Sequence, residues 1–195
     1  MHLLLKRKRG KPAAAGGDPV NIYIDTREKP HAIRLILAHF IREGWNIHRQ
    51  ALPEGDYALS LDALYVIDRK QNLSEVCNNL TWERGRFLRE LQRAKDKGKK
   101  LCILVENCPG IQLLEDVKAW ANPRRRDSPK GIAGEHLYKM MLVLQMQYGI
   151  EWRFCSGRNT GAEIARLLME NSTAKERNET DGSKEPEEQT RKAGV

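Results

Sequence analysis

Strand-like and helix-like segments alternate along residues 21–169, and this alternation limits the possible folds more than any other feature of the sequence. A short apolar run at 21–25 precedes an amphipathic stretch of helical period that begins near Pro30 and stops before Gly44. Apolar residues repeating at i, i+3, i+4 and i+7 predict a helix, and short apolar runs between turn residues predict strands. The pattern therefore predicts an α/β fold with a mixed central sheet and helices on both faces.

The remaining segments continue this alternation. Three strand-like pieces with short turns between them indicate an antiparallel meander, and they span residues 45–52, 56–60 and 63–68. The spacing then predicts helices over 72–80 and from about Trp82, followed by a buried strand at 101–106, a helix at 137–148, a strand at 151–155 and a last helix from Thr160.

Both ends of the chain differ in composition from this central part. Residues 1–20 hold five bases and one acid beside an Ala- and Gly-rich run, so we expect a flexible basic arm. Residues 170–195, with five bases and seven acids, are expected to form a disordered charged tail. The domain between them, residues 21–169, keeps +6 of the net charge of +8, which favours a polyanionic partner.

Several classes of protein are disfavoured by composition. No apolar run is long enough to span a bilayer and the N-terminus lacks the apolar region of a signal peptide, so we expect no membrane association and a cytoplasmic or nucleoid-associated protein. The four cysteines form no CxxC or CxH pair, so we do not expect a structural zinc site.

The strand-like segment ALYVID runs directly into the charged residues Asp68, Arg69 and Lys70. Side chains two apart in a strand point to the same face, so Asp68 and Lys70 share one face and Arg69 points to the other. The preceding hairpin brings Asp56 to a neighbouring strand end. Two carboxylates beside an amine form a site for Mg²⁺ with a cationic side chain next to it. Phosphodiester hydrolysis uses these same groups.

This charged pattern has a plain alternative. Acid-x-Lys occurs by chance in any sequence as charged as this one, and the segment is then a solvated strand end with a salt bridge worth little to stability.

Three short motifs in a fixed order favour the first interpretation: IDTRE at 24–28, LPEGDYAL at 52–59 and VIDRK at 66–70. Together they resemble the nuclease domain of the XPF-type structure-specific endonucleases, a branch of the restriction-endonuclease-like PD-(D/E)XK fold. The resemblance covers roughly residues 21–169. It implies catalytic roles for Asp25, Glu28, Asp56, Asp68, Arg69 and Lys70.

The same resemblance implies a metal ion, Mg²⁺ with Mn²⁺ able to substitute, held by Asp56, Asp68 and Asp25. Two departures from the family pattern stand out: the family usually has Glu where Asp68 stands, and its later Asp falls on Ser74, with Glu75 beside it. The sequence also lacks a counterpart of the tandem helix-hairpin-helix module of many relatives, which leaves open a homodimer or a partner subunit that supplies duplex binding.

Two basic clusters are candidate DNA contacts. Residues 82–100 hold eight bases against three acids, and a phosphate-tracking face and a solvated face are about equally supported there. A Pro-rich loop at 122–130 is a second candidate. The predicted DNA-binding residues are Arg27, Arg84, Arg86, Arg89, Arg93, Arg124, Arg125 and Arg126.

The sequence thus predicts a Mg²⁺-dependent DNA endonuclease that cuts branched or flap DNA during recombination, repair or replication. A nuclease-fold subunit that binds DNA or a partner without catalysis is the main alternative. An RNA-directed or restriction-type nuclease on the same fold is the third hypothesis, since fold does not determine substrate.

Overall fold

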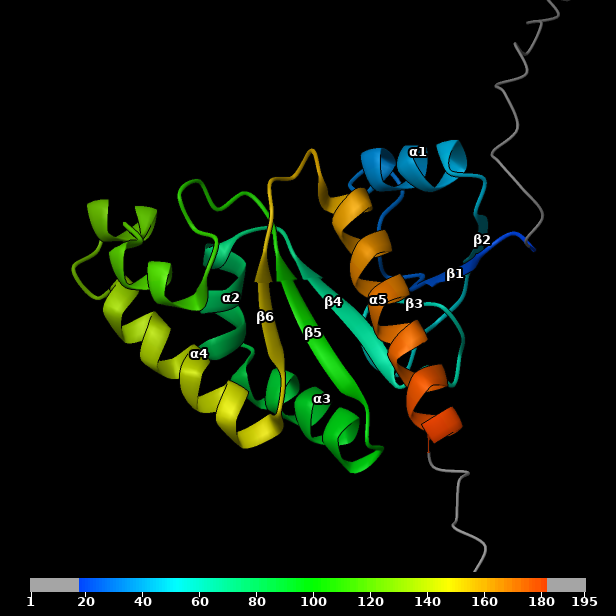
Figure 1. Cartoon of the computed structure of the whole chain (residues 1–195). Coiled ribbons are helices and arrows are strands. Elements are labelled where there is room, and N and C mark those ends of the chain that lie inside the picture. Colours follow the sequence, from blue (N-terminus) through cyan, green and yellow to red (C-terminus); the bar gives the residue numbers. More distant parts are fainter. Residues whose placement is uncertain (1–17, 182–195) are drawn as a thin grey trace, which may run out of the picture.

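The computed structural model describes residues 18–181, and its centre is a six-stranded mixed sheet (Figure 1). The strand order is β2-β1-β3-β4-β5-β6. Every neighbouring pair is parallel except those of β3, which runs antiparallel to both β1 and β4. The strands are β1 (Asn21–Ile24), β2 (Asn46–Arg49), β3 (Tyr57–Ala58), β4 (Tyr65–Lys70), β5 (Lys100–Val105) and β6 (Glu151–Phe154).

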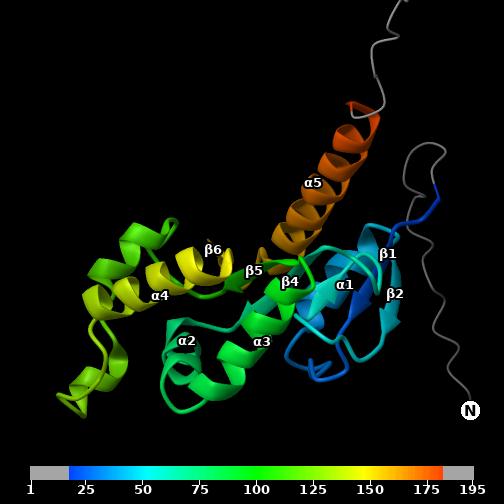
Figure 2. The same ribbon diagram turned by 90° about the horizontal axis from the view of Figure 1, so that it is seen from below.

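Helices cover both faces of this sheet (Figures 1 and 2). Two of them, α1 (Arg34–Arg42) and α5 (Thr160–Asp181), pack on one face, where Ile36 and Ile164 join a buried cluster with Ile67 of β4. The opposite face belongs to a second cluster that includes Val66 of β4. That face is covered by α2 (Leu73–Leu80), α3 (Arg84–Asp96), the 3₁₀ helix η1 (Leu114–Ala119) and α4 (Gly134–Tyr148).

The alternation of Val66 and Ile67 between the two clusters explains why β4 is apolar at consecutive positions. A strand covered on both faces must present apolar side chains to each. The predicted α/β class, with a mixed sheet and helices on both faces, is confirmed. No helix among residues 18–181 is long and apolar enough to cross a membrane.

The predicted antiparallel meander is wrong in one strand. Only β3 and β4 form the expected hairpin, whereas β2 pairs in parallel with β1, with Asn21 opposite Asn46. Turn residues after β2 carry no information on which strand edge it joins, and the crossover through α1 delivers it to the far side of β1.

Two helix boundaries also differ from expectation. Helix α1 begins at Arg34 rather than near Pro30, and Ile41 near its end is 69% exposed although it is apolar. Helix α5 continues to Asp181, so residues 170–181, expected to be part of a disordered tail, are helical. The rest of that tail, 182–195, and residues 1–17 of the basic arm lie outside the described residues.

The central strands place three acidic residues, Asp25, Asp56 and Asp68, at neighbouring positions of the sheet. The Asp25 amide, just after β1, donates to the carbonyl of Asp56 (2.8 Å), and the Asp56 amide donates to the carbonyl of Ile67 (2.7 Å). Gly55 precedes Asp56 with φ +71°, and a Cβ there would lie 3.0 Å from the Ile67 carbonyl oxygen. The turn into β3 therefore needs glycine at position 55, and it places Asp56 beside the charged end of β4.

Candidate active site

The charged end of β4 is enclosed by protein. All six residues of the strand are buried, including Asp68, Arg69 and Lys70. The alternative prediction of a solvated strand end is therefore wrong. Burial makes the pairing of each charge a requirement, because an isolated ion is costly to remove from water.

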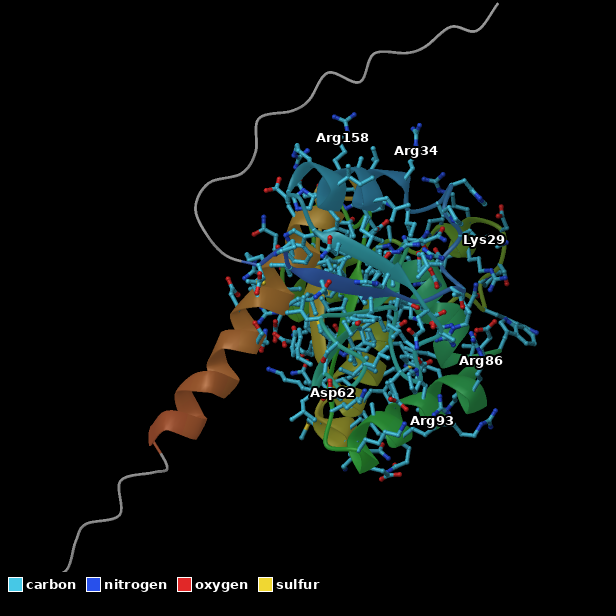
Figure 3. All side chains as sticks on the ribbon, turned by 90° about the vertical axis from the view of Figure 1, so that its right-hand side faces the viewer. Lys29, Arg34, Asp62, Arg86, Arg93 and Arg158 are labelled. Atoms are coloured by element: carbon cyan, nitrogen blue, oxygen red, sulfur yellow. The ribbon has the colours of Figure 1, made fainter. Side chains whose placement is uncertain are left out.

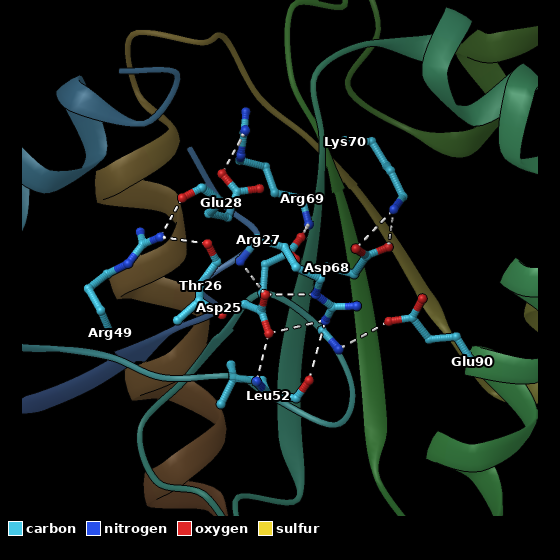
Figure 4. A network of polar contacts seen from close by, with 12 residues as sticks. Asp25, Thr26, Arg27, Glu28, Arg49, Leu52, Asp68, Arg69, Lys70 and Glu90 are labelled. Atoms are coloured by element: carbon cyan, nitrogen blue, oxygen red, sulfur yellow. Dashed lines mark hydrogen bonds and ion pairs between the residues drawn. The ribbon is translucent and has the colours of Figure 1, made fainter. Parts of the chain in front are cut away.

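Lys70 and Asp68 form a close ion pair on one face of β4 (Figure 4). Lys70 Nζ donates to Asp68 Oδ1 at 2.9 Å and lies 2.6 Å from Oδ2. The Phe87 ring of α3 lies below the ammonium, 5.5 Å from Nζ to the ring centroid.

Asp56 completes the acidic pair. Its Oδ2 accepts a hydrogen bond from the Arg69 amide at 2.9 Å. Burial raises the pKa of Asp56 well above its ordinary value, and the neighbouring charge of Asp68 raises it further. For Lys70, burial disfavours the charged form, but the charges of Asp68 and Asp56 outweigh it and raise the pKa of the lysine.

The donor set suits a divalent cation. Two carboxylates share one site with a single lysine, and one of the carboxylates has a raised pKa. Oxygen donors with excess negative charge are the ligands that Mg²⁺ prefers, and Mg²⁺ completes its shell with water. Residues 18–181 contain no cluster of three or more His, Cys, Asp or Glu side chains arranged to hold a metal by themselves.

A cavity of about 150 Å³ opens over this pair. Arg27 and Arg86 contribute positive charge to its wall, and Glu75 and Glu90 contribute negative charge. Its lining consists of Arg27, Glu28, Asp56, Asp68, Arg69, Lys70, Glu75, Asn79, Arg86, Phe87 and Glu90.

Asp25, predicted as a metal ligand, does not line that cavity. Its Oδ1 accepts from the amide and Nε of Arg27, both at 2.7 Å, and its Oδ2 accepts from the Leu52 amide at 2.6 Å (Figure 4). Burial works against the charge, but these hydrogen bonds prevail and lower the pKa of Asp25. The geometry favours a positioning role, in which Asp25 holds Arg27 at the cavity and ties the segment before β3 to the end of β1.

Arg69 points to the opposite face of β4, as the strand period predicts. Its guanidinium pairs with Glu28 at 2.8 Å and with Glu106 at 3.2 Å. Glu28 also accepts from the Tyr57 hydroxyl at 3.5 Å. This buried network ties the segment after β1 to β4 and β5, and it leaves Arg69 with structural partners in addition to its place in the cavity wall.

Four residues of the cavity lining are not among the predicted site residues: Glu75, Asn79, Phe87 and Glu90. Glu90 of α3 accepts from the Gly55 amide at 3.3 Å, and burial together with the charge of Asp68 raises its pKa. The buried Asn79 donates to Glu83, while its Oδ1 has no hydrogen-bond partner within residues 18–181. Glu90 lies one turn after Arg86 and three residues after the inward-facing Phe87. This spacing places Glu90 on the same side of the helix as those residues, and it was the feature of the sequence that could have predicted its position.

The basic run of α3 divides into two groups. Arg84 and Arg89 are exposed and form no ion pair with any acid in the described part of the chain. Lys97 and Lys99 instead lie 2.7 Å and 3.6 Å from the fully buried Glu54, with Arg93 at 3.9 Å. Part of the predicted DNA-binding run therefore compensates an internal acid.

Further bases surround the domain. Arg124, Arg125 and Arg126 are exposed on the 3₁₀ helix η2 (Pro123–Arg126), and Arg124 donates to Asn78 of α2 at 3.4 Å. Figure 3 shows Arg34 and Arg158 at one end of the molecule, with Lys29 and Arg86 along one side.

Comparison with known proteins places this geometry in a family. The ERCC4 domain matches residues 24–168. Among solved structures, XPF from Aeropyrum pernix matches with a TM-score of 0.54 and 24% identity over 78% of this chain and 65% of that chain. The structure titled as XPF from Aeropyrum pernix in complex with DNA matches with a TM-score of 0.54 and 23% identity over 79% of this chain and 66% of that chain.

The chain thus spans just under two thirds of the length of these structures. No curated protein matches it at the level of sequence. The family match extends from Ile24, the last residue of β1, to Leu168 in α5, so it includes the whole of the other five strands. The chain therefore belongs to the ERCC4 domain family, the family of XPF-type nuclease domains.

Proposed function

We propose that this protein hydrolyses phosphodiester bonds in branched or flap DNA in a reaction that requires Mg²⁺, for which Mn²⁺ substitutes. The observation that carries the proposal is the buried Asp56–Asp68 pair, with Lys70 against Asp68, at the base of a cavity that Arg27 and Arg86 line. A solvated ion pair of the same residue types carries no such implication, because it costs nothing to maintain.

Each residue has a distinct part in this proposal. Asp56 and Asp68 would hold the ion, which when bound supplies activation of water and neutralisation of phosphate charge. Lys70, whose raised pKa keeps it protonated, stabilises the negative charge that develops on the phosphate. Arg27 and Arg86 receive phosphates of the cleaved strand, and Asp25 and Glu28 position Arg27 and Arg69.

The direct test is cleavage of labelled duplex, single-stranded, flap, fork and four-way DNA, and of a matched RNA duplex, with Mg²⁺, with Mn²⁺ and with excess EDTA. The proposal predicts cleavage of branched or flap DNA that EDTA abolishes and Mn²⁺ restores. Tight DNA binding without cleavage under every condition would instead favour a non-catalytic DNA-binding subunit. Preferred cleavage of RNA or of unbranched duplex would contradict the proposed substrate.

Asp56→Asn is expected to make the protein more stable at neutral pH. The raised pKa of Asp56 means that the folded state disfavours its charged form, so stability falls as the pH rises from the ordinary carboxyl pKa to the folded-state pKa and stays lower above it. Asparagine keeps an acceptor for the Arg69 amide and removes the charge, so the melting temperature at neutral pH should rise. The gain should vanish below about pH 4, where the carboxyl is protonated in both states.

Thermal unfolding measured across pH checks this expectation, with Asp96→Asn on the exposed side of α3 as the matched control. Added Mg²⁺ should raise the melting temperature of the parent protein and leave that of Asp56→Asn unchanged. A variant that is less stable than the parent at pH 7, or that keeps the Mg²⁺ shift, would contradict the role given to Asp56.

Salt dependence tests the basic face of α3. Replacing Arg84 and Arg89 together by alanine should reduce the slope of log affinity against log salt by about 2, since each phosphate contact contributes about 0.9. Lys139→Ala on α4, whose lysine already pairs with Glu135, is the control and should leave the slope unchanged. An unaltered slope in the double variant would assign α3 to a solvated face.

A further inference from the structure

Trp82 is the most exposed of the large apolar side chains that the structure describes. It lies in the turn between α2 and α3 and is 83% exposed. The other tryptophans have packing partners: Trp45 stacks on Phe40, and Trp152 is buried and donates to the Met141 carbonyl. Across residues 18–181, Trp82 takes part in no recorded hydrogen bond or ring contact, and its surface is costly to leave in water.

Trp82 forms part of the wall of a second cavity, separate from the one over Asp68. The volume of this cavity is about 540 Å³, within the range of small-ligand sites. Arg124 and Lys130 outnumber the single acid, Asp127, in its lining, so its charge favours an anionic ligand. The lining residues are Cys77, Thr81, Trp82, Asn122, Arg124, Asp127, Ser128, Lys130, Gly131 and Ile132.

The α2–α3 turn connects this cavity to the candidate active site. Asn79 lines the active-site cavity, while its neighbour Asn78 accepts a hydrogen bond from Arg124 of the second cavity (3.4 Å). On the other side of the turn, Glu83 follows Trp82 and binds both Asn79 and Arg86. Residues of this one turn thus contribute to the linings of both cavities, Asn79 to the first and Trp82 to the second.

An exposed indole lies beside two cations that form no ion pair with an acid among residues 18–181, and this combination indicates the ligand class. A base in duplex DNA is already stacked on both faces, so an indole gains most from a base that is unpaired. Stacking on aromatic rings combined with basic contacts to the backbone is how proteins hold single strands without sequence preference. A purely apolar partner would leave the charges of Arg124 and Lys130 without a counterpart.

We propose that Trp82, Arg124 and Lys130 form a binding site for an unpaired nucleotide of a single-stranded arm, with the base stacked on Trp82 and its phosphates on the two cations. The inference rests on the proposed DNA cleavage, and it adds a residue that senses the single-stranded side of the junction. The site distinguishes forked or flap DNA from plain duplex by a contact that only an unpaired base supplies.

Equilibrium binding in excess EDTA separates this site from catalysis. The probes are a fork with an unpaired arm, the same fork with abasic sites along that arm, and a fully paired duplex. Trp82→Ala should weaken binding to the fork about tenfold while duplex affinity stays unchanged, given the stacking energy of one base. Trp82→Phe should retain most of the affinity, and Leu61→Ala, an exposed apolar residue outside both cavities, should have no effect.

The abasic arm provides the decisive comparison. The parent protein should lose affinity for the abasic fork by about the same factor as the Trp82→Ala variant loses for the intact fork, and the variant should lose nothing more. Equal effects of Trp82→Ala on fork and duplex, or no effect on either, would overturn the site. Failure to cleave DNA would contradict the proposed function alone, because these measurements need no turnover.

Discussion

Asp68→Asn is expected to abolish cleavage while the fold and DNA binding are kept. The change removes one negative charge from a buried site with almost no change in volume, and it withdraws one of the two carboxylates that would hold the metal. Asp56 remains to compensate Lys70, so we expect only a modest change in melting temperature. Single-turnover cleavage of the best branched substrate, with binding measured in parallel in EDTA, checks the prediction.

The control for this variant is Asp96→Asn, which removes a carboxylate from the exposed surface of α3. It should cleave at the parental rate. Parental activity of Asp68→Asn, or full activity of the parent in excess EDTA, would show that the reaction does not depend on a metal held at the end of β4.

Lys70→Ala is expected to lower the cleavage rate by a factor on the order of a hundred or more, judged from losses of comparable electrostatic groups. The structure adds a consequence for stability, because Lys70 is buried against Asp68 and its removal leaves that acid uncompensated. Breaking a buried pair from one side costs about 3–5 kcal/mol. The sequence alone predicts that loss of Lys70 would hardly change the stability of the fold, as for a lysine in a surface ion pair. Because Lys70 is buried, that prediction is wrong.

Rate and stability must therefore be separated in this experiment. Cleavage is measured well below the melting temperature of each variant, and Lys70→Met, which keeps most of the side-chain volume, serves as the second variant. Lys70→Arg should restore little activity, because the planar guanidinium is larger and forked. A folded Lys70→Met protein that cleaves at close to the parental rate would remove the lysine from the catalytic mechanism.

The class of fold was predictable because its evidence is local. Burial of β4 on two faces requires apolar residues at consecutive positions, and the helices between strands carry apolar residues at helical spacing. The opposite facing of Arg69 and Lys70 also follows from the two-residue period of a strand. The motifs around Asp25, Asp56 and Asp68 carried the family resemblance, which the ERCC4 match confirms.

The partners of the charges were not predictable from the sequence. Asp25 was predicted to be a metal ligand, but its two carboxylate oxygens accept hydrogen bonds from Arg27 and from the Leu52 amide. Arg93, predicted to contact DNA, lies 3.9 Å from the buried Glu54. The sequence gives the type of each charged residue, but it does not say whether the residue's partner is a metal ion, a phosphate or another side chain.

By itself, then, the sequence determined the alternation of strands and helices, the charged end of β4 and the order of the three motifs, because each depends on residues that lie close together along the chain. Only the tertiary structure decided which edge β2 joins, that Glu90 and Asn79 reach the cavity, and that Trp82 is left exposed beside Arg124. The physical reason is common to all three: these contacts join residues far apart in the chain, and packing of the whole domain determines which of them meet.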